Sequence, residues 1–62
     1  MDADDYRWVA EKMAGYSRRK YNDLSKAEQT NRHPELLLTL KGEASRANRI
    51  AGECLQIAEE IQ

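Results

Sequence analysis

The second half of the chain carries a repeat of apolar and small residues that is typical of one long helix packed against another. Between residues 37 and 61 these side chains recur at alternating intervals of three and four, the heptad spacing of a helix-packing seam. The seam consists of Leu37, Leu40, Ala44, Ala47, Ala51, Cys54, Ala58 and Ile61. It predicts a helix over about residues 34–61, and the small side chains at its middle permit close approach of another helix.

A proline marks the start of this helix. Pro34 cannot continue a helix from the residues before it, and it disfavours helix at His33. Proline is nevertheless well suited to the first turn of a new helix. We therefore place a turn at about residues 30–33 and expect the helix to begin near Pro34.

The first half of the chain has a less regular amphipathic pattern, which predicts a helix over about residues 4–29. Lys20 interrupts the apolar face, although its methylene groups can lie along a core while its ammonium group reaches water. A second interpretation breaks the helix near Asn22, because Ser25 and Glu28 have the spacing of a capping box. We favour one continuous helix, whose apolar face consists of Ala3, Tyr6, Ala10, Met13, Ser17, Leu24 and Ala27.

Two helices of similar length joined by a short turn make an antiparallel hairpin, so the expected fold is all-α, with one domain over residues 1–62. A chain this short buries little apolar surface by itself. A single cysteine, Cys54, excludes an intrachain disulfide, and a single histidine, His33, excludes a His/Cys metal cluster within one chain. We therefore expect a homodimer in which two hairpins pair as a four-helix bundle, with the seam as the oligomer contact.

The sequence contains no recognisable catalytic motif. Cys54 lies on the seam without a histidine near it, and the adjacent Glu59 and Glu60 point apart on a helix. The chain has no glycine-rich phosphate loop and no pair of Glu-x-x-His motifs for a di-iron site. We expect a non-enzymatic protein that uses no cofactor and no metal.

Composition and charge favour a folded protein of the cytoplasm. Hydrophobic residues make up 40% of the chain and the net charge is −1, whereas disordered chains combine low hydrophobicity with high net charge. The acidic N-terminus is unlike a signal peptide, and no apolar run approaches the roughly 18 residues that cross a membrane. The free cysteine fits a reducing compartment.

Trp8 is the first candidate for a functional residue, because the helical periodicity places it away from the apolar face of the first helix. Tryptophan is enriched at binding hot spots. Gly15 lies seven residues further on, hence on the same face, and glycine is unfavourable inside a helix. We predict a protein-binding surface of Trp8, Lys12, Gly15 and Arg19, and hence a small regulatory or inhibitory adaptor that binds a larger protein. The competing interpretation is that Trp8 packs on the second helix or on a partner hairpin.

A basic stretch supports an alternative function, binding to nucleic acid. Cations neutralise phosphates, and the interleaved Tyr16 and Tyr21 have rings that can stack on unpaired bases. The candidate residues are Arg18, Arg19, Lys26, Arg32, Arg46 and Arg49. The competing interpretation is a solvated face with ordinary charge pairs, such as Arg49 with Glu53 at i, i+4 spacing.

Two further interpretations remain open at this point. Residues 35–56 can be read as a helix-turn-helix, with Gly42 in the turn and Arg46, Asn48 and Arg49 in the major groove. Against it, the seam runs through Gly42 without the change of phase that a turn produces. The other is a self-assembling structural unit, in which the seam itself is the functional surface.

Overall fold

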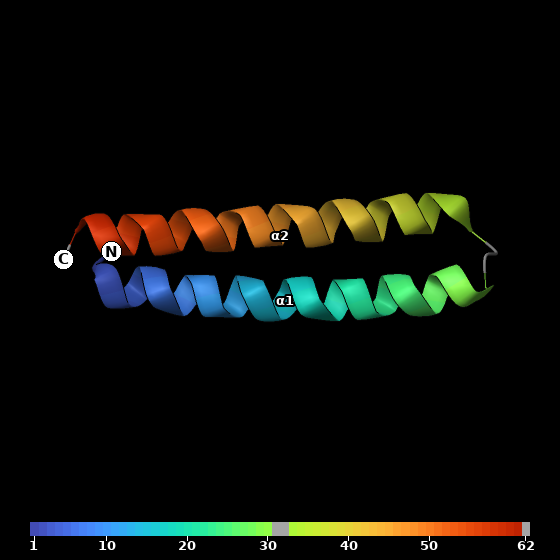
Figure 1. The fold of residues 1–62 in the computed structure, drawn as a ribbon, viewed down its shortest axis with the longest axis horizontal. Coiled ribbons are helices and arrows are strands. Elements are labelled where there is room, and N and C mark those ends of the chain that lie inside the picture. The colour runs from blue at the N-terminus through green and yellow to red at the C-terminus, as the bar shows by residue number, and fades with distance from the viewer. Residues whose placement is uncertain (31–32, 62) are drawn as a thin grey trace.

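The computed structural model describes residues 1–30 and 33–61, and within them the chain forms two helices. Helix α1 spans Ala3–Thr30 and helix α2 spans Pro34–Glu60. The helices lie side by side and antiparallel along their whole length, with both termini at the same end (Figure 1). The hairpin measures 47 × 13 × 13 Å. The prediction of an all-α helical hairpin is therefore confirmed.

The helix bounds differ from the expected ones by one residue at three of the four ends. Helix α1 is continuous through Asn22 and Ser25, so the structure does not contain the alternative break. Helix α2 is continuous through Gly42, so residues 35–56 do not form a helix-turn-helix. The expected turn includes Asn31 and Arg32, which lie outside the described residues.

The two helices begin in different ways. At the start of α1, the backbone N–H of Asp5 donates to Asp2 Oδ1 at 2.9 Å, and the backbone N–H of Asp2 donates to Asp5 Oδ2 at 3.4 Å. This reciprocal pair satisfies two backbone donors in the manner of a capping box and places negative charge at the positive end of the helix dipole. Helix α2 starts instead on Pro34, and the carbonyl of His33 accepts from the backbone N–H groups of Leu36 and Leu37.

The seam of α2 lies against α1 within the same chain. Ala44 at its centre has no exposed surface, Leu37 at one end is partly buried, and Ile61, just beyond the last helical residue, is 50% exposed. The remaining seam residues Leu40, Ala47, Ala51, Cys54 and Ala58 are buried. The seam expected at an oligomer contact therefore packs the hairpin itself.

Helix α1 contributes a different kind of surface to this contact. Of its residues only Ala10 and Ser17 are buried. Its larger side chains Tyr6, Val9 and Met13 lie beside the contact instead and, together with Ala14 and with Ile50 of α2, pack partly buried around Ala10, Ala51 and Cys54. In the described part of the chain, no large side chain is fully buried. The core of the hairpin is thus narrow and consists mainly of alanine.

Polar contacts between the helices set their register. Ser17, buried, donates from Oγ to the carbonyl of Ala44 at 2.9 Å. The residues next to this pair are also in contact: the Tyr16 hydroxyl donates to Glu43 Oε2 at 2.7 Å, and Lys20 Nζ lies 3.6 Å from the same oxygen. The Lys20 ammonium also lies 5.2 Å from the centroid of the Tyr16 ring. Buried polar groups stabilise a fold only when they are satisfied, so these partners favour one alignment of the helices.

Neither helix of the described chain has the length and apolar character needed to span a membrane.

Candidate docking surface

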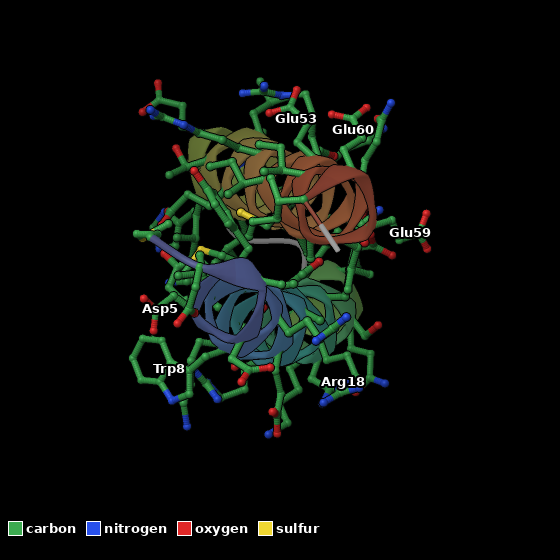
Figure 2. All side chains as sticks on the ribbon, turned by 90° about the vertical axis from the view of Figure 1, so that its left-hand side faces the viewer. Asp5, Trp8, Arg18, Glu53, Glu59 and Glu60 are labelled. Atoms are coloured by element: carbon green, nitrogen blue, oxygen red, sulfur yellow. The ribbon has the colours of Figure 1, made fainter. Side chains whose placement is uncertain are left out.

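Trp8 lies on the outer face of α1. Its side chain points away from α2 (Figure 2) and is 61% exposed, so it is not packed on the second helix. Lys12, one turn further along, places its ammonium nitrogen 5.5 Å from the centroid of the indole ring. This is the geometry of a cation–π contact. The contact holds a flat aromatic surface against a positive charge at the surface of the protein.

Gly15 leaves a shallow groove next to this pair. A Cβ at Gly15 would meet only Arg19 Nη1 at 3.7 Å and Arg18 Nη2 at 3.9 Å, both at ordinary contact distances. Close packing therefore does not require glycine here, although glycine costs about 1 kcal/mol of helix propensity relative to alanine. The groove is lined by Glu11, Lys12, Met13, Gly15, Tyr16, Arg18 and Arg19.

The structure thus brings the four predicted docking residues onto one exposed part of α1. We call Trp8, Lys12, Gly15 and Arg19 the Trp8 surface. It combines an aromatic ring, two cations and a gap large enough for a side chain of another molecule. Arg18, which the sequence suggested only for nucleic acid, joins the groove as a third cation. This surface has the chemistry to receive an apolar or aromatic group next to a carboxylate.

The described candidate nucleic-acid residues lie on both helices, and several of them line grooves that share Tyr16. Arg18 and Arg19 are exposed on α1, and Lys26 lines a groove with Arg19 and Tyr16 further along it. Arg46, on α2, lines another groove with Tyr16, Glu43 and Ile50. Arg49 Nη1 bonds Glu53 Oε1 at 3.1 Å, the pairing expected from their spacing. Arg32 lies outside the described residues.

The titratable groups of the interhelical contact are mutually perturbed. The hydrogen bond from Tyr16, followed by the positive charge of Lys20, lowers the pKa of Glu43 below its ordinary value of 4.5. The same hydrogen bond to Glu43 raises the pKa of Tyr16 above 10.0, with desolvation acting in the same direction. The sequence did not indicate this contact, because it joins residues 27 apart and depends on the helix register.

Cys54 and the glutamates of α2 lie in different surroundings. The free thiol of Cys54 is buried against Ala10 and Ala51. Glu59 points in a different direction from α2 than Glu53 and Glu60 do (Figure 2). Within residues 1–30 and 33–61, no group of three or more His, Cys, Asp or Glu side chains is placed to hold a metal ion.

Comparison with known proteins finds no matching family model, no similar curated protein and no similar solved structure. The Trp8 surface and the interhelical contacts are therefore the observations on which a functional proposal for this chain rests.

Proposed function

We propose that this protein is a small non-enzymatic adaptor, regulatory or inhibitory, that binds a larger protein through the Trp8 surface. The observation that carries the proposal is the 61% exposure of Trp8 on a face that takes no part in packing the hairpin. Aromatic side chains bury on the order of 150–250 Å² when covered, so an exposed indole offers a large gain to a partner. Tryptophan and arginine are also the residue types most enriched at binding hot spots.

The chemistry of the surface specifies the partner. The indole requires an apolar pocket, and the gap at Gly15 admits a protruding side chain. Lys12, Arg18 and Arg19 favour carboxylates at the rim of that pocket, with Glu11 the one acidic residue lining the groove. The expected partner is thus a protein with an apolar pocket bordered by acidic residues.

The proposed adaptor is a homodimer, in which two hairpins form a four-helix bundle. The support is that one hairpin leaves its larger apolar side chains only partly covered, because its core is made of alanine and a few larger residues. Among the exposed large apolar residues, Leu36, Leu38 and Leu55 lie on α2, and Ile61 follows its last residue. The free thiol of Cys54 supports a reducing compartment such as the cytoplasm as its location.

The test of the docking function is affinity capture with the wild type and with Trp8→Ala, with and without nuclease. Leu38→Ala is the matched control, because it removes a side chain that is 73% exposed on the other helix. We expect a stoichiometric protein that survives nuclease, is retained by Leu38→Ala and is lost with Trp8→Ala. For the purified partner, Trp8→Ala should raise the Kd about 30-fold or more, as truncation of a hot spot does.

Three results would contradict the proposal. Circular dichroism that shows Trp8→Ala unfolded would mean that the indole supports the fold rather than a partner. Recovery of nucleic acid, or of proteins that nuclease removes, would instead support the basic residues as the functional surface. Recovery of this chain alone would support a self-assembling structural unit.

A further inference from the structure

One side of the hairpin carries four larger apolar side chains that are only partly buried. Val9 and Tyr16 lie seven residues apart on α1, and Ile50 and Ile57 lie seven apart on α2. Seven residues are close to two helical turns, so each pair forms a row along its helix. Tyr16 and Ile50 line the same groove, which places both rows on one side of the hairpin. We call Val9, Tyr16, Ile50 and Ile57 the lateral face.

The opposite side of the hairpin has fewer large apolar residues. The corresponding row of α1 contains Arg7, Ala14, Tyr21 and Glu28, and that of α2 contains Lys41, Asn48 and Leu55. The rows of the lateral face also reach charged residues, Asp23 on α1 and Glu43 on α2, and Glu43 is already paired with Lys20. A second hairpin on the lateral face would cover more apolar surface, including three β-branched residues, so this face is the better site for a second copy.

The charges that border the lateral face are ordered along its length. On α1 the bordering row begins with Asp5 and continues at intervals of seven with Lys12, Arg19 and Lys26. It therefore changes from negative to positive away from the N-terminus. Arg19 and Lys26 line a groove with Tyr16, which places this row next to the lateral face.

The bordering row of α2 changes in the opposite sense along the sequence. It runs from Arg46, which lines the groove with Tyr16 and Ile50, to Glu53 and Glu60 at the same spacing. Because the two helices are antiparallel, both rows are negative near the chain termini and positive nearer the turn. Two acidic residues depart from this order: Glu43 is paired with Lys20, and Asp23 lies in a groove between cations.

We propose that the lateral face packs on the lateral face of a second copy, with the twofold axis perpendicular to the helices. This inference rests on the homodimer proposed above. A perpendicular axis lays α1 antiparallel on the second copy's α1, so the negative end of one hairpin meets the positive part of the other. An axis parallel to the helices would place like ends together, and juxtaposed like charges disfavour an interface.

The perpendicular axis also follows from the positions of the apolar residues. If the axis passes midway between Val9 and Tyr16, each of these side chains faces the other in the second copy. Ile50 then meets its own copy across the axis. The same geometry brings Asp5 near Arg19 of the second copy and Glu53 near Arg46 of the second copy, while the two Lys12 side chains meet near the axis, where their ammonium groups can reach water.

This arrangement has a consequence for docking. Trp8 points from α1 away from α2 (Figure 2), and the perpendicular axis places the two α1 helices side by side. Both Trp8 surfaces therefore face the same side of the bundle. A parallel axis would put them on opposite sides. The dimer is thus a bivalent adaptor, suited to a partner that is itself twofold or that carries two adjacent pockets, where linked binding events add avidity.

The test is a distance between spin labels attached to Ser25→Cys in a Cys54→Ala background. Ser25 is exposed near the turn end of α1, and Cys54→Ala places alanine in a seam that already contains four alanines. Ser25 is about twelve residues from the midpoint of Val9 and Tyr16, so a perpendicular axis separates the labels by about 36 Å along the helices. A parallel axis places both labels at one end, on α1 helices that lie diagonally across the bundle, so they are less than about 25 Å apart.

Sedimentation of the same sample separates the possible failures. A dimer with labels near 36 Å supports the inference. A dimer with labels below 25 Å overturns the perpendicular axis while leaving the proposed dimer intact. A monomer, with no dipolar coupling, overturns both. Loss of helicity or of dimer mass in the unlabelled Cys54→Ala protein would move the measurement to the wild-type background, with Cys54 left buried and unreactive to the label.

Charge reversal supplies an independent measurement of the same interface. We expect Arg19→Glu to raise the dimer Kd about tenfold at low salt, because it places like charges together at two symmetric contacts. Adding Asp5→Arg to that variant should restore the dimer. Arg18→Glu is the control, since it makes the same change of charge from an exposed position that points away from α2 (Figure 2). Equal weakening by Arg18→Glu, or failure of the double reversal to restore dimerisation, would overturn the proposed pairing.

Discussion

The two helices are similar in length but contribute differently to the molecule. Helix α2 buries six residues, four of them alanine, in one regular line. Helix α1 buries only two and keeps its aromatic residues at the edge of the contact or on the outside. A line of small side chains allows the helices to approach without large residues between them, which leaves the larger side chains of α1 available for other contacts. The difference supports the proposal that α2 mainly packs the hairpin and that α1 mainly carries recognition.

The largest expected effect comes from a charge in the seam. Ala47→Glu should destabilise the hairpin by about 3 kcal/mol or more, because it places an unpaired carboxylate at a position that is only 4% exposed. Circular dichroism should show loss of helicity, and sedimentation should show loss of any oligomer. Asn48→Glu, at the exposed position next to it, should leave both unchanged. A folded Ala47→Glu protein of unchanged mass would show that the seam of α2 does not pack the hairpin.

The next effect compares a buried with an exposed side chain. Leu40→Ala should lower the free energy of unfolding by about 2–4 kcal/mol, as truncation of buried leucine does. Trp8→Ala removes a larger side chain but should change the free energy of unfolding by less than about 0.5 kcal/mol, the usual range for surface positions. Urea unfolding followed by circular dichroism measures both. Comparable losses in the two variants would show that α1 and α2 do not divide packing and recognition as described.

The same contrast explains what the sequence could and could not predict. The seam of α2 was predictable because its spacing is regular and its members are small or apolar. In α1, Lys20 occupies a position that the periodicity assigns to the apolar face, and only the helix register shows that its ammonium group pairs with Glu43. Ile61 fits the periodicity but is half exposed, because it follows the last residue of α2.

The surface was less predictable than the core. Periodicity placed Trp8 off the apolar face of α1, but it did not decide between a free indole and one packed on α2. That depends on how the helices lie in space. Likewise, Arg46 and Arg49 were expected to extend the basic stretch because α2 returns alongside α1. In the structure Arg46 lines a groove with Tyr16 of α1, whereas Arg49 pairs with Glu53 on its own helix.

Replacing the glycines of the two helices by alanine should have a smaller effect, which stabilises the hairpin. Gly42→Ala and Gly52→Ala should each raise the free energy of unfolding by about 1 kcal/mol, because a Cβ meets no described atom within 4 Å at either position. Gly15→Ala should stabilise by a similar amount, yet it places a methyl group in the groove of the Trp8 surface. We expect only Gly15→Ala to weaken partner binding, measured by calorimetry alongside thermal unfolding. Weakened binding in all three variants would mean that helix rigidity, and not the groove, controls recognition.

The smallest effect is a pH dependence that arises where the two helices exchange polar contacts. Because the pKa of Glu43 is lowered in the folded state, its contribution to stability is present above its ordinary pKa of 4.5 and is lost as pH falls through the lowered value. The pKa of Tyr16 is raised, so its contribution is present below 10.0 and is lost as pH rises through the raised value. The contact therefore stabilises the hairpin most between these limits. Thermal unfolding across the pH range should show Glu43→Gln flattening the acidic side of the profile and Tyr16→Phe the alkaline side. If either variant keeps the full wild-type profile, the Tyr16–Glu43 hydrogen bond does not contribute to the alignment of α1 on α2.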